Sequence, residues 1–230
     1  MKSCLTSLLL PGVALLISSC GNRLTEQQKA SLTQVMVSRP AVESTDLKPA
    51  DGTESPGASN SVPMATGGGI IPALIGTAID AGVTAHQSAE FKKQYGAQLE
   101  EVQAAIPRNP GDDLRQRAAK ALKKDAFFGT RMVEAGAANR FDGELVQYGL
   151  VRYAREDDQT VLGMEIRCTV WLADAGGKKL FSQVISGRSR DSHTIHDYAA
   201  KKSLVKAAYD QALDDFESKF AAMLDFQLSR

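Results

Sequence analysis

The 230-residue sequence has few of the residues that most often carry chemistry, with three cysteines, three histidines and one tryptophan. It also has no excess of charge of either sign, because lysine plus arginine and aspartate plus glutamate both number 27. Nucleic-acid-binding proteins normally carry a basic excess, so no nucleic-acid partner is expected. No apolar run reaches the length of about 20 residues that a membrane-spanning helix needs.

What is present begins with an export signal. Lys2 precedes an apolar stretch from Leu5 to Ile17, and Ser18, Ser19 and Cys20 follow it. An apolar residue, two small residues and then Cys-Gly resemble the lipobox of bacterial lipoproteins. The resemblance implies a signal peptide at residues 1–19, cleavage before Cys20, and acylation of its sulfur and its freed amine, typically with palmitate. Several acyl chains anchor a protein durably on a bilayer, whereas one binds only marginally. The alternative is a buried core helix with an incidental cysteine.

Lipidation would leave the mature chain without a disulfide framework. Cys4 leaves with the signal and Cys20 is acylated, so Cys168 has no partner within the chain and the fold must rest on packing. Gly21 stands where the best-known inner-membrane lipoproteins have an aspartate. The sequence therefore predicts an outer-membrane anchor facing the periplasm, with the inner membrane and the cell surface as alternatives.

The rest of the chain divides by composition. A polar tether is predicted at residues 20–32, a short β-branched strand at 33–40 that Pro40 ends, and a disordered linker at 41–69. The linker is rich in Ser, Thr, Asp, Pro and Gly, and it cannot bury enough apolar surface to offset its ordering entropy. An α+β domain is predicted at 70–226. A linker of this length within a domain is unusual, so the alternative is that the short strand lies outside the sheet.

The segment Gly69–Gly82 is apolar and rich in small residues. Its apolar run, Ile70–Ile79, is about half the length that a bilayer requires, and Asp80 would be costly there. The segment is therefore predicted to form a short helix, started by Pro72 and packed on the core. A membrane-inserting segment and a contact between subunits of a homo-oligomer are the alternatives.

Two helices are predicted next. Apolar residues recur every three or four positions from Gln87 to Ile106, which places them on one helical face. A second helix is predicted to start at Asn109 as N-cap, with Pro110 in the first turn and lysines near its end that suit the helix dipole. These lysines are interpreted as solvated.

The clearest tertiary signal spans residues 141–224. Three strands are predicted at 143–153, 161–172 and 179–185, with short turns between them that make an antiparallel meander. A long amphipathic helix follows, with an apolar stripe formed by Val205, Tyr209, Ala212, Phe216, Phe220 and Met223. The predicted fold class is α+β, in which a meander of three to four strands packs against this helix and the preceding helices as two layers.

This order of elements, with Gly149–Val151, the stretch from Leu172 to Leu180 and the closing helix, resembles small envelope lipoproteins. The families are the auxiliary lipoproteins of ABC transporters and accessory lipoproteins with a TolB-N-terminal-like α+β domain. The resemblance implies a noncatalytic protein that binds an envelope protein partner and needs no cofactor.

The search for chemistry finds one cluster. His193 and His196, with Asp191 and Asp197 beside them, are the only dense group of metal-type ligands, although short polar stretches before helices often serve as caps. They support an alternative function, a metal-dependent hydrolase. Trp171, on the polar side of its strand, is a candidate for partner contact; its alternative is packing beneath an earlier helix.

Overall fold

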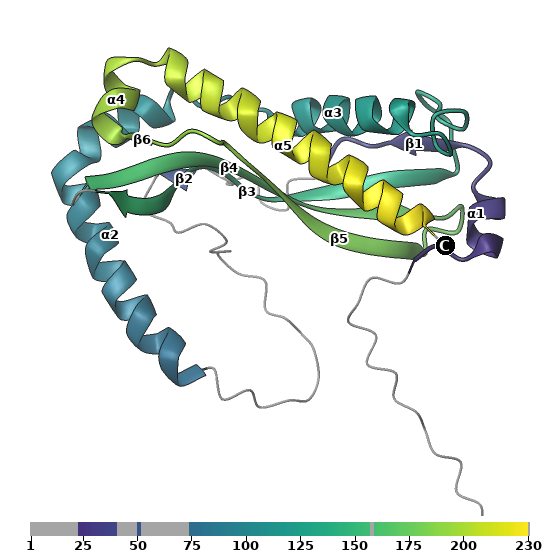
Figure 1. Ribbon diagram of the computed structural model, residues 1–230, viewed down its shortest axis with the longest axis horizontal. Coiled ribbons are helices and arrows are strands. Elements are labelled where there is room, and N and C mark those ends of the chain that lie inside the picture. Colours follow the sequence, from purple (N-terminus) through teal and green to yellow (C-terminus); the bar gives the residue numbers. More distant parts are fainter. Residues whose placement is uncertain (1–22, 41–49, 52–73, 157–158, 230) are drawn as a thin grey trace, which may run out of the picture.

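The computed structural model describes residues 23–40, 50–51, 74–156 and 159–229 (Figure 1). Its elements, in chain order, are α1 (Glu26–Ser31), β1 (Val35–Val37), β2 (Ala50–Asp51), α2 (Leu74–Gln103), α3 (Pro110–Lys124), β3 (Asn139–Glu156), β4 (Gln159–Ala173), β5 (Lys179–Arg188), β6 (His193–Thr194), α4 (Ile195–Ala200) and α5 (Ser203–Leu228). The predicted α+β fold class is confirmed.

One mostly antiparallel sheet organises these elements. The strand order is β1-β3-β4-β5, and β2 and β6 pair with β3 and β4 respectively. The predicted meander is present, because β3 pairs antiparallel with β4, and β4 pairs antiparallel with β5. The strand at Val35–Val37 pairs parallel with the start of β3, so it belongs to the sheet.

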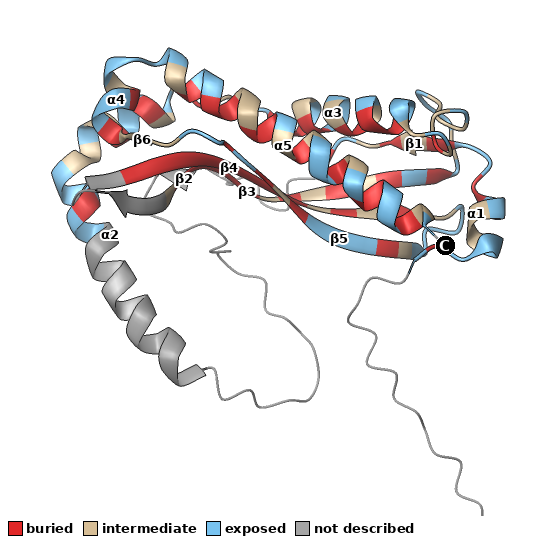
Figure 2. Cartoon of the chain, viewed as in Figure 1, coloured by how far each residue is buried: buried red, intermediate tan, exposed pale blue. Residues whose placement is uncertain are grey.

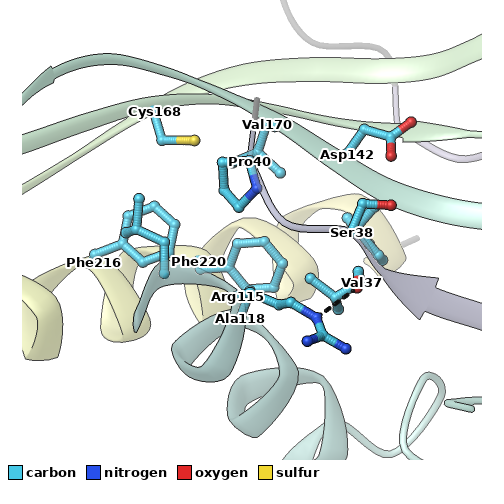
Figure 3. Close-up of a pocket in the computed structure, with 13 residues that line it drawn as sticks. Val37, Ser38, Pro40, Arg115, Ala118, Asp142, Cys168, Val170, Phe216 and Phe220 are labelled. Carbon is cyan, nitrogen blue, oxygen red and sulfur yellow. Dashed lines mark hydrogen bonds between the residues drawn. The ribbon is translucent and has the colours of Figure 1, made fainter. Parts of the chain in front are cut away.

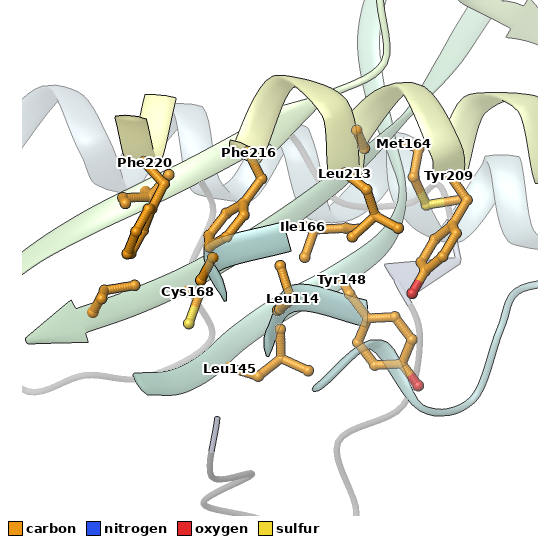
Figure 4. Packing of buried hydrophobic residues seen from close by; sticks show 14 of the residues in the cluster. Leu114, Leu145, Tyr148, Met164, Ile166, Cys168, Tyr209, Leu213, Phe216 and Phe220 are labelled. Atoms are coloured by element: carbon orange, nitrogen blue, oxygen red, sulfur yellow. The ribbon is translucent and has the colours of Figure 1, made fainter. Parts of the chain in front are cut away.

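Helices α3 and α5 cover one face of the sheet (Figures 1 and 2). The predicted stripe of α5 is buried throughout, and Phe216 and Phe220 are 1% and 0% exposed. They pack against the predicted apolar side of β4, including Ile166 and Cys168 (Figure 4). Each buried Phe contributes on the order of 1.5–3 kcal/mol.

Gly187 allows α5 to lie directly on β5. A Cβ atom at this position would overlap the carbonyl oxygen of Ala212 and would lie 2.8 Å from the Cβ of Phe216. The close approach therefore depends on glycine.

An ion cluster joins α3 to α5. The Glu217 carboxylate on α5 accepts hydrogen bonds from Lys120 (2.9 Å), Lys124 (3.0 Å) and Arg117 (3.1 Å) on α3. Burial alone would raise the pKa of Glu217, but these three cations outweigh it and lower the pKa to about 2. Lys120 and Lys124 are more than half exposed, as the sequence predicted for solvated cations, and they also bind Glu217 on another helix.

The predicted tether at 20–32 is wrong over its described part. Thr25 caps α1 through a capping box with Gln28, and the flanking residues Leu24 and Leu32 are 4% and 0% exposed. The polar composition of this segment therefore did not predict α1, which Leu24 and Leu32 hold against the core.

The helical region before α3 also differs from its prediction. A single element, α2, runs from Leu74 to Gln103 with a non-helical Tyr95 (φ −120°, ψ 15°), where a short helix and a separate helix were expected. The apolar face is confirmed from Phe91 to Ile106. No side chain of Gly69–Gly82 is described, so the packing predicted for Ile70–Ile79 lies outside what the structure describes.

Two other predictions differ from the structure in part. Residues 50 and 51, inside the predicted linker 41–69, form β2 and pair parallel with Gly149 and Leu150; the rest of that linker lies outside the described residues. Asn109 stands at the N-cap of α3 with Pro110 after it, but its side chain makes no capping hydrogen bond.

Candidate interaction surface

The outer edge of β5 is the distinctive surface of this fold. Strand β5 ends the sheet, and in the part of the chain that the structure describes no further strand pairs with it. An exposed edge presents a row of backbone N–H and C=O groups to which another chain can pair. Such an edge is either protected from pairing with another strand or used to bind another chain.

Helix α5 protects half of this edge. The Asp215 carboxylate accepts a hydrogen bond from the backbone N–H of Arg188 (2.8 Å). The Lys219 ammonium donates to the carbonyl oxygen of Ser186 (2.8 Å) and to Asp215 (2.7 Å). Side chains of α5 therefore bind the outward N–H of Arg188 and the outward C=O of Ser186.

The other half of the edge is open. Backbone groups two residues apart in a strand face the same way, so those of Ser182 and Val184 point outward like those of Ser186. The Val184 side chain is 56% exposed, and Figure 2 shows the middle of β5 as an exposed stretch. By register Val184 pairs with Thr169, on the sheet face away from α3 and α5.

A groove of about 500 Å³ runs along this open edge. Its walls are β5 from Ser182 to Ser186 and the side of α5 that carries Lys219, Ala222, Met223 and Phe226. The only large hydrophobic side chains that are exposed among the described residues, Val184 and Phe226 (45%), both lie on it. A groove of mixed polar and apolar lining beside unpaired backbone suits an extended peptide.

At the opposite edge of the sheet, β1 is itself covered. The segment after α3 runs along β1, where the N–H of Val35 donates to Arg131 (3.0 Å) and the N–H of Val133 donates to Val35 (2.9 Å). A groove of about 310 Å³ between β1 and α3 consequently has no open strand edge along it.

The cavity beside Cys168 is too small for a ligand (Figure 3). It measures about 10 Å³ and lies between Pro40, Phe216 and the sheet, which is barely the volume that one water needs. Burial raises the pKa of the Cys168 thiol to about 12. Cys168 is therefore a core residue and not a nucleophile.

The two histidines of the predicted cluster have separate aromatic neighbours. The His193 ring packs edge-on against Tyr198 with centroids 5.4 Å apart, and the His196 ring packs edge-on against Tyr95 at 5.3 Å. Within the described residues, no three His, Cys, Asp or Glu side chains are arranged to hold a metal ion.

The two aspartates of that cluster have structural roles. Asp197 caps α4 by accepting hydrogen bonds from the N–H and hydroxyl of Thr194, and the hydroxyl bond is the main cause of its lowered pKa. Asp191 accepts a hydrogen bond from Gln211 of α5 (2.6 Å). These contacts engage one carboxylate in the capping box of α4 and the other in a hydrogen bond with α5.

Trp171 is half-buried on the sheet face away from α3 and α5. Lys179 places its ammonium 3.9 Å from the centre of the indole ring, an arrangement that is typical of a cation–π pair. Trp171 stays a candidate contact, next to the start of β5. Cys20 lies outside the described residues.

Sequence reasoning missed the open edge of β5, although two signals pointed to it. The last strand of a meander is an edge strand, and Val184 is an apolar residue between Ser182 and Ser186 on one face of that strand. The blocking contacts from Asp215 and Lys219 needed the structure, because they join residues about 30 positions apart.

Comparisons with known proteins add little to this description. No protein-family model matches the chain, and no curated protein matches it. Among solved structures, the chain is similar to a minor lipoprotein from Acinetobacter baumannii, at 15% identity and a TM-score of 0.37, over 51% of this chain and 84% of that one. No helix in the described part of the chain is long and apolar enough to cross a bilayer.

Proposed function

We propose that this chain is a lipid-anchored protein of the bacterial cell envelope, and that it acts by binding a protein partner without catalysing a reaction. The anchor would be Cys20, in the outer membrane and facing the periplasm. The observation that carries the binding role is the open half of the β5 edge with its groove.

The occupant we propose is a short extended segment of another envelope protein. Its backbone would pair with the N–H and C=O groups of Ser182 and Val184, and its apolar side chains would lie against Ala222 and Met223. Side chains of α5 occupy the edge at 186–188, so a long second strand has no room to continue there. A short segment fits the open length.

Charge at the groove adds a preference. Lys219 stands at the blocked end with half of its side chain exposed, and Lys179 is exposed at the start of β5. The segment is therefore expected to be apolar at its centre with an acidic residue at one end or both, because opposite charges steer and orient a partner.

Site-specific photo-crosslinking in intact cells tests this proposal. A photoreactive amino acid at Val184 of the full-length protein is expected to give one discrete adduct with an envelope protein. Ala222→Lys, which fills the groove, should abolish the adduct. Ala207→Lys, on an exposed part of the same helix outside the groove, should leave it intact.

Two outcomes contradict the proposal. An adduct between two copies of this chain would make the edge a self-association surface. An adduct pattern that is the same in the Ala222→Lys and Ala207→Lys variants would show that the groove has no part in binding.

A further inference from the structure

We infer that one end of the molecule, formed by α1 and the last turn of α5, lies directly against the bilayer. We call this end the membrane pole and define it by Arg23, Leu24, α1 and Phe226. The inference rests on the proposed acylation of Cys20, and it adds how the folded part is oriented on the membrane.

The chain enters the fold at this pole and is fixed there. The N–H of Leu24 donates to the carbonyl oxygen of Gln227 (3.3 Å), and the Leu24 side chain is 4% exposed. The Lys29 ammonium of α1 donates to the carbonyl oxygen of Leu228 (3.0 Å). Figure 1 shows α1 beside the C-terminal end of α5.

The link between the anchor and this pole is short. Cys20 precedes Arg23 by three positions, and a fully extended chain covers at most about 3.6 Å per residue, so the two Cα atoms lie within roughly 11 Å of each other. A tether reaching to residue 32 would have allowed the domain to tumble freely, but α1 removes that freedom. The pole must therefore stay near the headgroups.

The chemistry of the pole suits the headgroup region. The Phe226 ring is 45% exposed, and the Arg23 guanidinium lies 4.8 Å from its centre. Aromatic rings and basic side chains are the residues that favour a membrane interface. A cation over one face of the ring leaves an apolar surface that acyl chains can cover.

The charged groups around the membrane pole are of both signs. The exposed cations Lys178 and Lys179 lie at the end of the β4–β5 turn. The strand ends at this turn lie beside β1 and the last turn of α5. Among the carboxylates, Glu26 pairs with Lys29 (2.9 Å), and Asp174 accepts backbone N–H groups within its own turn. Asp225 is exposed on α5. These charges are therefore not expected to repel anionic lipid strongly.

This orientation has a consequence for the groove. Phe226 lines the groove as well as the pole, so one end of the groove opens beside the bilayer. A partner segment that enters there would come from the part of the partner nearest the membrane.

Fluorescence quenching by brominated lipid tests the inference on the full-length lipidated protein. The native tryptophan is removed by Trp171→Phe, and a single tryptophan is introduced by Phe226→Trp. The matched control carries Lys201→Trp, an exposed position near α4 at the far end of the molecule. Vesicles contain phosphatidylethanolamine and phosphatidylglycerol, with or without brominated phosphatidylcholine.

The expected result is a roughly twofold loss of emission at position 226 in brominated vesicles, because interfacial side chains reach about 5–10 Å into the bilayer and so approach the brominated chains. Emission at position 201, at the far end of the molecule, should change little. A second reporter avoids dependence on the Phe226 substitution. Gln27→Cys on α1, labelled with an environment-sensitive dye, should show increased and blue-shifted emission on vesicles. The buried Cys168 does not compete for the label.

The outcomes separate the two proposals. Protein that sediments with vesicles but shows equal quenching at 226 and 201, with no change at position 27, overturns the orientation and leaves the lipid anchor intact. Protein that does not sediment with vesicles overturns the anchor itself.

Discussion

Replacing Glu217 by Gln removes the charge that joins α3 to α5 and keeps the shape of the side chain. In the folded protein the pKa of Glu217 is about 2, against an ordinary value of 4.5. At about 1.4 kcal/mol for each tenfold change in proton affinity, the full effect would be roughly 3 kcal/mol. Lys120 and Lys124 are more than half exposed, so solvent screens their attraction. We therefore expect the free energy of unfolding to fall by about 1–2 kcal/mol at pH 7.

The sign of the pH dependence follows from the lowered pKa. A carboxylate whose pKa is depressed by folding stabilises the folded state above its unfolded pKa, and the stabilisation disappears as pH falls through the folded pKa. The difference between wild type and Glu217→Gln should therefore be full above pH 4.5, shrink between pH 4.5 and about 2, and vanish below that.

Urea denaturation of the purified mature protein at pH 7, pH 4 and pH 3 measures this difference directly. Asp210→Asn is the matched control, because Asp210 pairs with the exposed Lys206 on the same helix and should contribute less than about 0.5 kcal/mol. A Glu217→Gln effect that is equal at pH 7 and pH 3, or no larger than the control, would refute the reasoning.

Three further predictions concern the core. Phe216→Asp should leave the protein without a cooperative thermal transition, because it places a charge at a 1% exposed site between α5 and the sheet; a normal transition would disprove the packing. Gly187→Ala should lower the free energy of unfolding by about 2–4 kcal/mol, since the new methyl group overlaps Ala212; a denaturation midpoint unchanged from wild type would show that α5 can move away. Cys168 should react with a maleimide at pH 8 only after urea unfolding, because its pKa is raised to about 12; rapid labelling of the native protein would contradict its burial.

Much of the fold could be predicted because its signals are local. Alternation in β4 identified the buried residues from Met164 to Leu172, and the three-to-four spacing in α5 identified its buried stripe. The short turns that the sequence predicts at 155–159 and 174–178 then allowed only an antiparallel meander.

The features that were missed depend on contacts between distant residues. Residues 23–32 look like a tether by composition, and it is the burial of Leu24 and Leu32 and the contacts with the end of α5 that make them part of the fold. The polar character of Glu165, on the polar side of β4, likewise does not predict its complete burial. In the structure its carboxylate accepts hydrogen bonds from Ser186 and Arg167. Nor does the sequence show which half of the β5 edge α5 protects.

The histidine cluster shows the same limit from the other direction. His193 and His196 are three positions apart, a spacing that can place two metal ligands on one helical face. In the structure the first lies on β6 and the second on α4, so they do not share a helix. A change of secondary structure between two residues is not visible in their spacing.

The proposed binding role and the orientation at the membrane both depend on attachment through Cys20. Mass spectrometry of the N-terminal tryptic peptide from membrane-extracted protein tests that attachment most directly. The expected peptide begins at Cys20, ends at Arg23, and carries a diacylglyceryl group on its sulfur and an acyl chain on its amine. A Cys20 thiol without lipid, or a peptide that runs from Ser3 to Arg23, would contradict it.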